Sequence, residues 1–215
     1  MAAGETINDL IEKAGGITEN AYLFGGVYLN EDAKTINKKS KQLLYELFLE
    51  NILSMSEKAD ENFDLTPLVG LAQELKKSEI NGRIVIDLLD EDSLNLNKIK
   101  DGDELIIPEN NNVVYIYGEI SSEGAVMFDQ NKDLDFFVGK SGGFKKTADL
   151  SSIFILHPNG ESELYSKKRN IFESSPQNQI KIYPGSIIFV PRALDKSTSR
   201  RIAAQAYVTI LGNLG

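Results

Sequence analysis

The chain has 215 residues, of which 41% are hydrophobic and 26% are charged, so it is long and apolar enough to form one or two globular domains. Its 32 acidic and 23 basic residues give a formal net charge of -9, which opposes binding to nucleic-acid phosphates and to anionic lipid surfaces. The absence of cysteine excludes disulfides, thiolate metal sites and a cysteine nucleophile.

The first predicted element is a short amphipathic helix near the start of the chain. Ile7, Leu10 and Ile11 have helical spacing, and Gly15 and Gly16 act as a helix stop. No basic segment followed by an apolar core precedes the helix, and no run of 18 apolar residues occurs, so the sequence predicts neither a signal peptide nor a membrane helix. Because the helix starts without a leader, we expect the chain to be a fragment of a longer protein.

Residues 31–79 are expected to form a helical hairpin. Apolar residues recur at spacings near three and four in two stretches. These residues are Ile36, Leu43, Leu44, Leu47, Phe48, Ile52 and Met55, then Leu65, Leu68, Val69, Ala72 and Leu75. The hairpin separates the first helix from the strands that follow it, so we interpret it as an insertion.

Two strand signals follow the predicted insertion. Asn81-Gly82 precedes the β-rich run at 83–86 and has the residue types of a hairpin turn. A second apolar run follows the turn around Gly102 and ends at Pro108. Because proline has no backbone donor, Pro108 is expected to end the strand pairing.

The second half of the chain repeats this pattern. A helix-like stretch that ends at Gly142 and Gly143 follows its counterpart at an offset of 127 residues. A closing strand that turns at Gly185 and ends at Pro191 follows its counterpart at an offset of 83. The two offsets differ by 44 residues, which the predicted helical insertion supplies.

The second copy also contains two predicted hairpins. The strand at 113–117, with Gly118 and a turn around Glu123-Gly124, predicts an opening hairpin, and Asn159-Gly160 predicts another. The opening hairpin has no counterpart in the first copy. Either preceding sequence supplies those strands, or the first copy has an open sheet edge.

The order of hairpin, helix, hairpin and closing strand resembles the soluble-ligand-binding β-grasp (SLBB) domain. The resemblance implies an α+β fold with two tandem β-grasp domains at 1–110 and 111–192, the first with the helical insertion. The strings that carry it are Ala14-Gly15-Gly16-Ile17-Thr18, Asp101-Gly102-Asp103, Gly118-Glu119-Ile120, Ser141-Gly142-Gly143-Phe144 and Pro184-Gly185. The candidate structural positions are Gly15, Gly16, Gly102, Pro108, Gly118, Gly142, Gly143, Gly185 and Pro191.

Tandem domains of this type with a helical insertion resemble the periplasmic part of polysaccharide export outer-membrane proteins, especially the capsule-export branch. The resemblance implies a non-enzymatic, oligomerising module of a transport conduit, periplasmic and associated with the outer membrane in the full-length protein. The implied partners are copies of the protein, an inner-membrane polysaccharide exporter and the polysaccharide chain. We expect no nucleic-acid partner and no cofactor. The alternative is a β-grasp module that binds a soluble ligand or oligosaccharide without ring assembly.

Residues 193–215 are expected to form a C-terminal helix behind the basic pair Arg200-Arg201. The apolar residues at helical spacing are Ile202, Ala203, Ala206, Tyr207, Ile210 and Leu211. Such a helix either packs on its own domain or meets the membrane.

Few residues indicate catalytic or metal chemistry. His157 is the only histidine, and one imidazole forms neither a metal site nor a convincing Ser-His-Asp arrangement, so we expect a structural or solvated role. The carboxylates at 87–92, Asp101 and Asp103 lack the spacing of a calcium loop and are interpreted as turn and surface charge. The basic run at 167–169 is interpreted as a solvated loop. No catalytic, metal-binding or ligand-binding residue is predicted.

Overall fold

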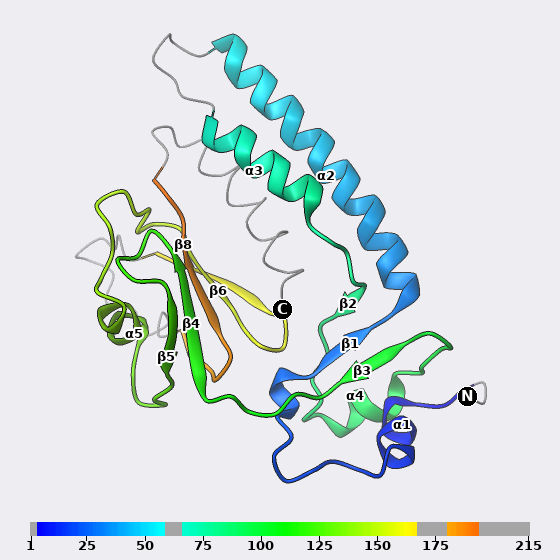
Figure 1. The fold of residues 1–215 in the computed structure, drawn as a ribbon. Helices are drawn as coiled ribbons and strands as arrows, with labels where there is room; N and C mark the ends of the chain where they lie inside the picture. The colour runs from blue at the N-terminus through cyan, green and yellow to red at the C-terminus, as the bar shows by residue number, and fades with distance from the viewer. Residues whose placement is uncertain (1–3, 59–65, 167–179, 194–215) are drawn as a thin grey trace.

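The computed structural model describes residues 4–58, 66–166 and 180–193. These residues form two β-sheets and five α-helices, which confirms the α+β class expected from the sequence (Figure 1). The predicted C-terminal helix at 193–215, apart from its first residue, and the basic run at 167–169, lie outside the described residues.

Helix α1 (Ile7–Lys13) is the first helix expected from the sequence, and it ends at the expected glycines. The Thr6 hydroxyl accepts a hydrogen bond from the Asp9 amide, and the Asp9 carboxylate accepts one from the Thr6 amide at 2.8 Å, which completes a capping box. These bonds from Thr6 hold the pKa of Asp9 below its usual value. At the other end, the Gly16 amide donates to the Ile11 carbonyl at 2.9 Å, and Gly16 has a φ of +87°, which glycine adopts without strain.

The first sheet follows α1 and has the strand order β2-β1-β3, with both pairs antiparallel. Its strands are β1 (Val27–Leu29), β2 (Arg83–Ile84) and β3 (Glu104–Ile106), and a 3-10 turn η1 (Leu23–Gly25) leads into β1. A short helix that the sequence did not predict, α4 (Glu91–Leu96), is capped by the Asp90 carboxylate. The buried core of this module consists of Ile7, Ile11, Tyr28, Ile86, Leu88, Leu94 and Ile99.

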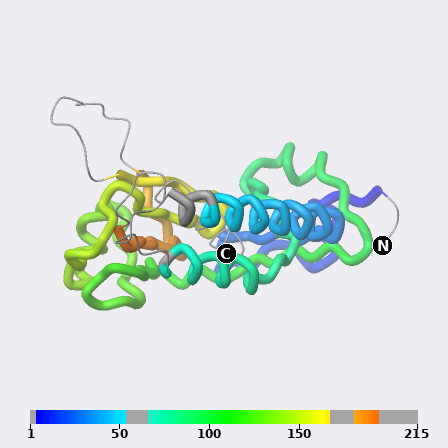
Figure 2. Tube along the Cα trace, turned by 90° about the horizontal axis from the view of Figure 1, so that it is seen from above, coloured from blue at the N-terminus to red at the C-terminus, as the bar shows by residue number. Residues whose placement is uncertain are grey.

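Helices α2 (Glu31–Lys58) and α3 (Thr66–Lys77) lie between β1 and β2 in the chain and run side by side (Figures 1 and 2). They share an apolar core of their own, made of Phe48, Ile52, Leu68, Leu71, Ala72 and Leu75. The prediction of a tight hairpin turn at Asn81-Gly82 is therefore wrong. The strand after Gly82 pairs with β1 across the whole helical pair, so the insertion occupies the position of the hairpin loop.

The second sheet has five strands in the order β5-β4-β8-β6-β7. They are β4 (Val113–Gly118), β5 (Gly124–Met127), β6 (Ile153–Leu156), β7 (Ser162–Tyr165) and β8 (Ile187–Val190). Strand β4 pairs in parallel with β8 at the centre, and the other pairs are antiparallel. Helix α5 (Leu134–Lys140) packs on one face, which completes a β-grasp arrangement. The core between them includes Val114, Ile116, Phe137, Val138, Ile155 and Ile188.

The two halves share equivalent hydrogen bonds. The Tyr22 amide donates to the Pro108 carbonyl at 2.8 Å, and the Asp149 amide donates to the Pro191 carbonyl at 2.8 Å. These four residues are related by the same offsets of 127 and 83 that relate the sequence motifs. The repeat in the sequence is thus a repeat of backbone geometry.

Gly118 and Gly139 give a matched test of this geometry in the second sheet. Gly118 has a φ of +98°, and a Cβ there would lie 2.1 Å from the Val190 carbonyl oxygen. We expect Gly118→Ala to lower the free energy of unfolding by about 2 kcal/mol or more. Gly139 lies in α5 with no atom within 4 Å of a Cβ, so Gly139→Ala is expected to raise it by about 0.5 kcal/mol. Urea unfolding measures both, and equal midpoints would contradict the prediction.

Candidate functional site

The nine positions singled out from the sequence lie at helix ends, turns and strand ends of two separate modules. The glycine pairs after α1 and α5 have positive φ angles, and so do the glycines in the turns before β3 and β8 and at the end of β4. The two proline carbonyls accept the equivalent hydrogen bonds described above. These positions are Gly15, Gly16, Gly102, Pro108, Gly118, Gly142, Gly143, Gly185 and Pro191. The structure does not bring them together in one site.

The two modules meet through aromatic side chains that the sequence did not single out. The Phe24 ring, from η1, stacks on the Tyr183 ring with centroids 4.2 Å apart. The Tyr22 hydroxyl donates to the Pro184 carbonyl at 3.1 Å, and burial raises the pKa of Tyr22 to about 12. The hydroxyl therefore stays protonated and remains a donor at neutral pH. We call these contacts, together with the hydrogen bond from Arg83 to the Pro158 carbonyl, the junction.

His157 lies fully buried behind the junction. Its Nδ1 lies 3.3 Å from the Ser186 hydroxyl and its Nε2 lies 3.1 Å from a Glu163 carboxylate oxygen. Its ring also meets the Tyr183 ring edge to face, with centroids 5.3 Å apart. His157 thus joins the β6–β7 loop to the turn before β8, which is a structural role and not a solvated one.

Arg83 reaches across the junction from β2. It is only 9% exposed, and its Nη2 donates to the Pro158 carbonyl. Its Nε and Nη1 have no hydrogen-bond partner within the described part of the chain, and burial lowers its pKa. The guanidinium covers Gly160, where a Cβ would lie 2.6 Å from Nε. The absence of a side chain at Gly160 therefore makes room for Arg83.

Sequence reasoning missed the junction because its residues have no pattern in the sequence. Tyr22 and Phe24 lie in a turn, and Arg83 is in a strand of two residues. The signal that was present was local: Gly160 and Pro184 are in turns that the sequence did predict. What those turns pack against depends on the tertiary fold.

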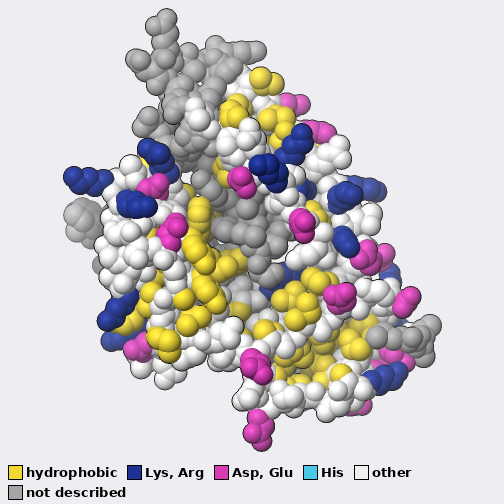
Figure 3. Space-filling view, viewed as in Figure 1, with side chains coloured by type: hydrophobic (Ala, Val, Ile, Leu, Met, Phe, Trp, Pro, Cys, Tyr) yellow, Lys and Arg dark blue, Asp and Glu magenta, His cyan; other side chains and the backbone are white. Residues whose placement is uncertain are grey.

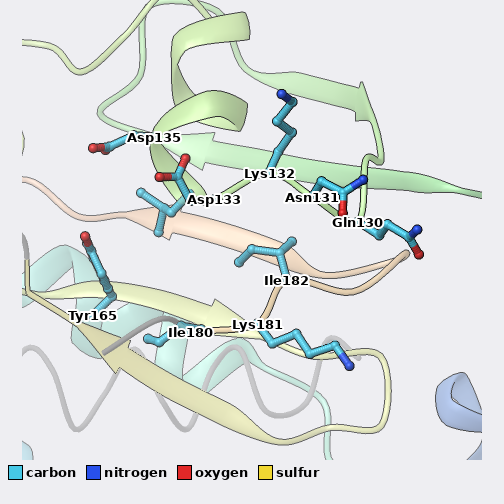
Figure 4. A pocket seen from close by; sticks show the side chains of 10 residues that line it. Gln130, Asn131, Lys132, Asp133, Asp135, Tyr165, Ile180, Lys181 and Ile182 are labelled. Atoms are coloured by element: carbon cyan, nitrogen blue, oxygen red, sulfur yellow. The ribbon is translucent and has the colours of Figure 1, made fainter. Parts of the chain in front are cut away.

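A pocket of about 820 Å³ lies between the segment that enters α5 and the segment that enters β8 (Figure 4). Lys132 and Lys181 on its rim point away from each other, and each ammonium lies over an aromatic ring, 5.3 Å and 4.9 Å from the ring centroids. The Asp133 carboxylate caps α5 by accepting from the Phe136 amide. These three charged groups thus have partners in the protein and do not converge on one point.

Two further features bear on the kind of site. Among the described residues, no cluster of three or more histidine or acidic side chains could hold a metal ion. In the same part of the chain, no helix is both long and apolar enough to cross a bilayer.

The comparison with known families agrees with the geometry of the first module. Residues 1–29 match the family model of the SLBB domain. The match covers α1, its glycine stop and β1, and it ends two residues before α2 begins. The inserted helices thus start where the match stops. No curated protein matches the chain in sequence. Residues 1–29 are thus similar in sequence to an SLBB domain.

Proposed function

We propose that this chain is part of a polysaccharide export protein of the capsule-export branch, and that it is an oligomerising, non-enzymatic module of a transport conduit. The SLBB match at residues 1–29 carries the proposal, because this domain is typical of polysaccharide export proteins. The equivalent hydrogen bonds of the two modules support a second SLBB domain after the first. On this proposal the module lies in the periplasm, and the full-length protein is associated with the outer membrane.

The proposed partners are copies of the protein, an inner-membrane polysaccharide exporter and the exported chain. Large apolar side chains are exposed along α2, and such surfaces favour contacts with other proteins. They are Ile36, Leu43, Leu47 and Leu53, with exposed fractions between 46% and 63%. The net charge of -9 disfavours nucleic acid as a partner.

The second candidate function is binding of a soluble ligand or oligosaccharide. The pocket beside α5 favours it, because its volume of about 820 Å³ is in the range of small-molecule sites. Lys132, Lys181 and Asp133 argue against ligand binding, because a ligand would have to compete with the partners that these groups already have in the protein. The conduit function requires an oligomer, whereas ligand binding does not.

The mass in solution separates the two functions. We expect a longer version of the protein, with an export domain ahead of residue 1, to form an oligomer of ring size, because stacked modules would add their contacts around a closed ring. Light scattering over a range of concentrations measures this for the longer version and for the present chain. Monomers of the longer version at every concentration, together with oligosaccharide binding by calorimetry, would favour the second function.

The junction gives a second test, because modules that support a conduit need a fixed mutual orientation. Phe24→Ala removes the ring that stacks on Tyr183, a contact worth about 1 kcal/mol beyond the buried area. We expect an increased radius of gyration in small-angle X-ray scattering with unchanged circular dichroism. Tyr117→Ala is the control, since Tyr117 is an exposed ring on β4. Equal radii for both variants would show that the stacked rings do not fix the junction.

A further inference from the structure

A groove of about 510 Å³ lies on the first module between α1 and β3. Figure 3 shows hydrophobic side chains gathered on this side of the molecule. The groove is lined by α1, by the segment after it and by the strand, with Leu10, Ile11, Ile17, Leu105, Ile106 and Ile107 among its residues. Strand β3 is at the edge of its sheet, so its outer side has no paired strand in the described residues.

The second module shows what covers the equivalent surface there. Strand β4 runs in parallel beside β8, and β5 pairs with the outer side of β4. Helices α1 and α5 start at Ile7 and Leu134, which the offset of 127 residues relates. Strands β3 and β8 start at Glu104 and Ile187, which the offset of 83 relates. The β4–β5 hairpin thus occupies the position at which the first module has its groove.

Equivalent residues are less buried in the first module than in the second, as expected if a hairpin covers them only in the second. Phe137 and Ile188 are fully buried in the second module, whereas their counterparts Leu10 and Leu105 are only partly buried. Ile17 is 48% exposed, whereas its counterpart Phe144 is partly buried and pairs with the residue at 120, beyond β4. The first module therefore exposes apolar surface that the second covers with a hairpin.

The edge of β3 offers the same hydrogen-bonding groups. In the second module the Tyr115 amide donates to the Ser186 carbonyl at 2.9 Å, and the Glu119 amide donates to the Val190 carbonyl at 2.8 Å. The offset of 83 assigns Asp103 to the position of Ser186, and the residue at 107 to that of Val190. A strand parallel to β3 would find these acceptors in register.

We propose that the groove between α1 and β3 is an acceptor site for a β-hairpin of the same type as β4–β5, with its first strand parallel to β3. The offset of 127 residues sets Met127, the last residue of β5, one position ahead of Met1. The occupant is therefore a segment that precedes residue 1 in the same polypeptide. Its apolar side chains take the places of Val114, Ile116 and Ile120, which are fully buried in the second module.

The hairpin site follows from the internal repeat and does not require polysaccharide export. A module completed in this way has no open edge at β3 and no exposed groove, whichever partner the protein serves. Exchange of backbone hydrogens in a monomer tests the site, so a negative result would leave the oligomer test of the export function unaffected.

The experiment fuses a second copy of residues 110–127 directly ahead of Met1, which places it in register by the repeat. We expect amide hydrogen exchange at Leu105 and Ile107 to slow by about tenfold or more, because these amides gain strand partners. We also expect a higher urea midpoint for the fusion than for the present chain. Light scattering has to show a monomer.

The matched control is the same fusion with aspartate at the copied positions of Val114 and Ile116. Its carboxylates cannot enter the apolar groove, so exchange at β3 is expected to equal that of the present chain. Equal exchange in the fusion and in its control would overturn the proposal. Protection that appears only with dimerisation would also overturn it, because a second copy would then supply the strand.

Discussion

The parallel pairing of β4 with β8 is the constraint on which the second module depends. The closing strand returns to the centre of the sheet, so it needs a strand on each side and a helix over one face. Gly118 permits this pairing, because its φ of +98° and missing side chain let the chain pass the Val190 carbonyl. The fully buried side chains of Val114, Ile116 and Ile188 then fill the space under α5. The sheet order and the apolar core thus follow from one strand contact.

The helical pair α2–α3 shows that the first module accommodates a long insertion at a point away from the position equivalent to the β4–β8 pair. It is inserted between β1 and β2, which pair antiparallel at the side of the sheet. Closing a long loop costs little more free energy than closing a short one, provided that the inserted residues bury their own apolar surface. The core of Phe48, Ile52, Leu68, Leu71, Ala72 and Leu75 meets that condition. At the equivalent point of the second module, a short turn with Asn159-Gly160 is sufficient.

The sequence predicted those parts of the fold that depend on local chemistry. Gly15-Gly16 and Gly142-Gly143 end their helices, because only glycine adopts these positive φ angles readily. The same logic failed at Asn81-Gly82, where the dipeptide is right for a turn but the pairing strand lies before the insertion. Helix α4 has six residues, too few for a periodic pattern. The junction of Phe24 with Tyr183 was not predictable, because its two rings are brought together only by the folded modules.

The first module is packed against its neighbour at the junction but exposes a sheet edge at the groove. At the junction, the buried Arg83 side chain leaves its Nε and Nη1 nitrogens without a hydrogen-bond partner in the described residues, which is costly in free energy. The Phe24 stack and the Tyr22 hydrogen bond offset part of that cost and hold the module against its neighbour. At the groove, the outer side of β3 has no paired strand among the described residues, and natural sheets usually cover or block such edges. A module held firmly on one side and open on the other is suited to receive a strand, because the acceptor edge is already ordered before the strand arrives.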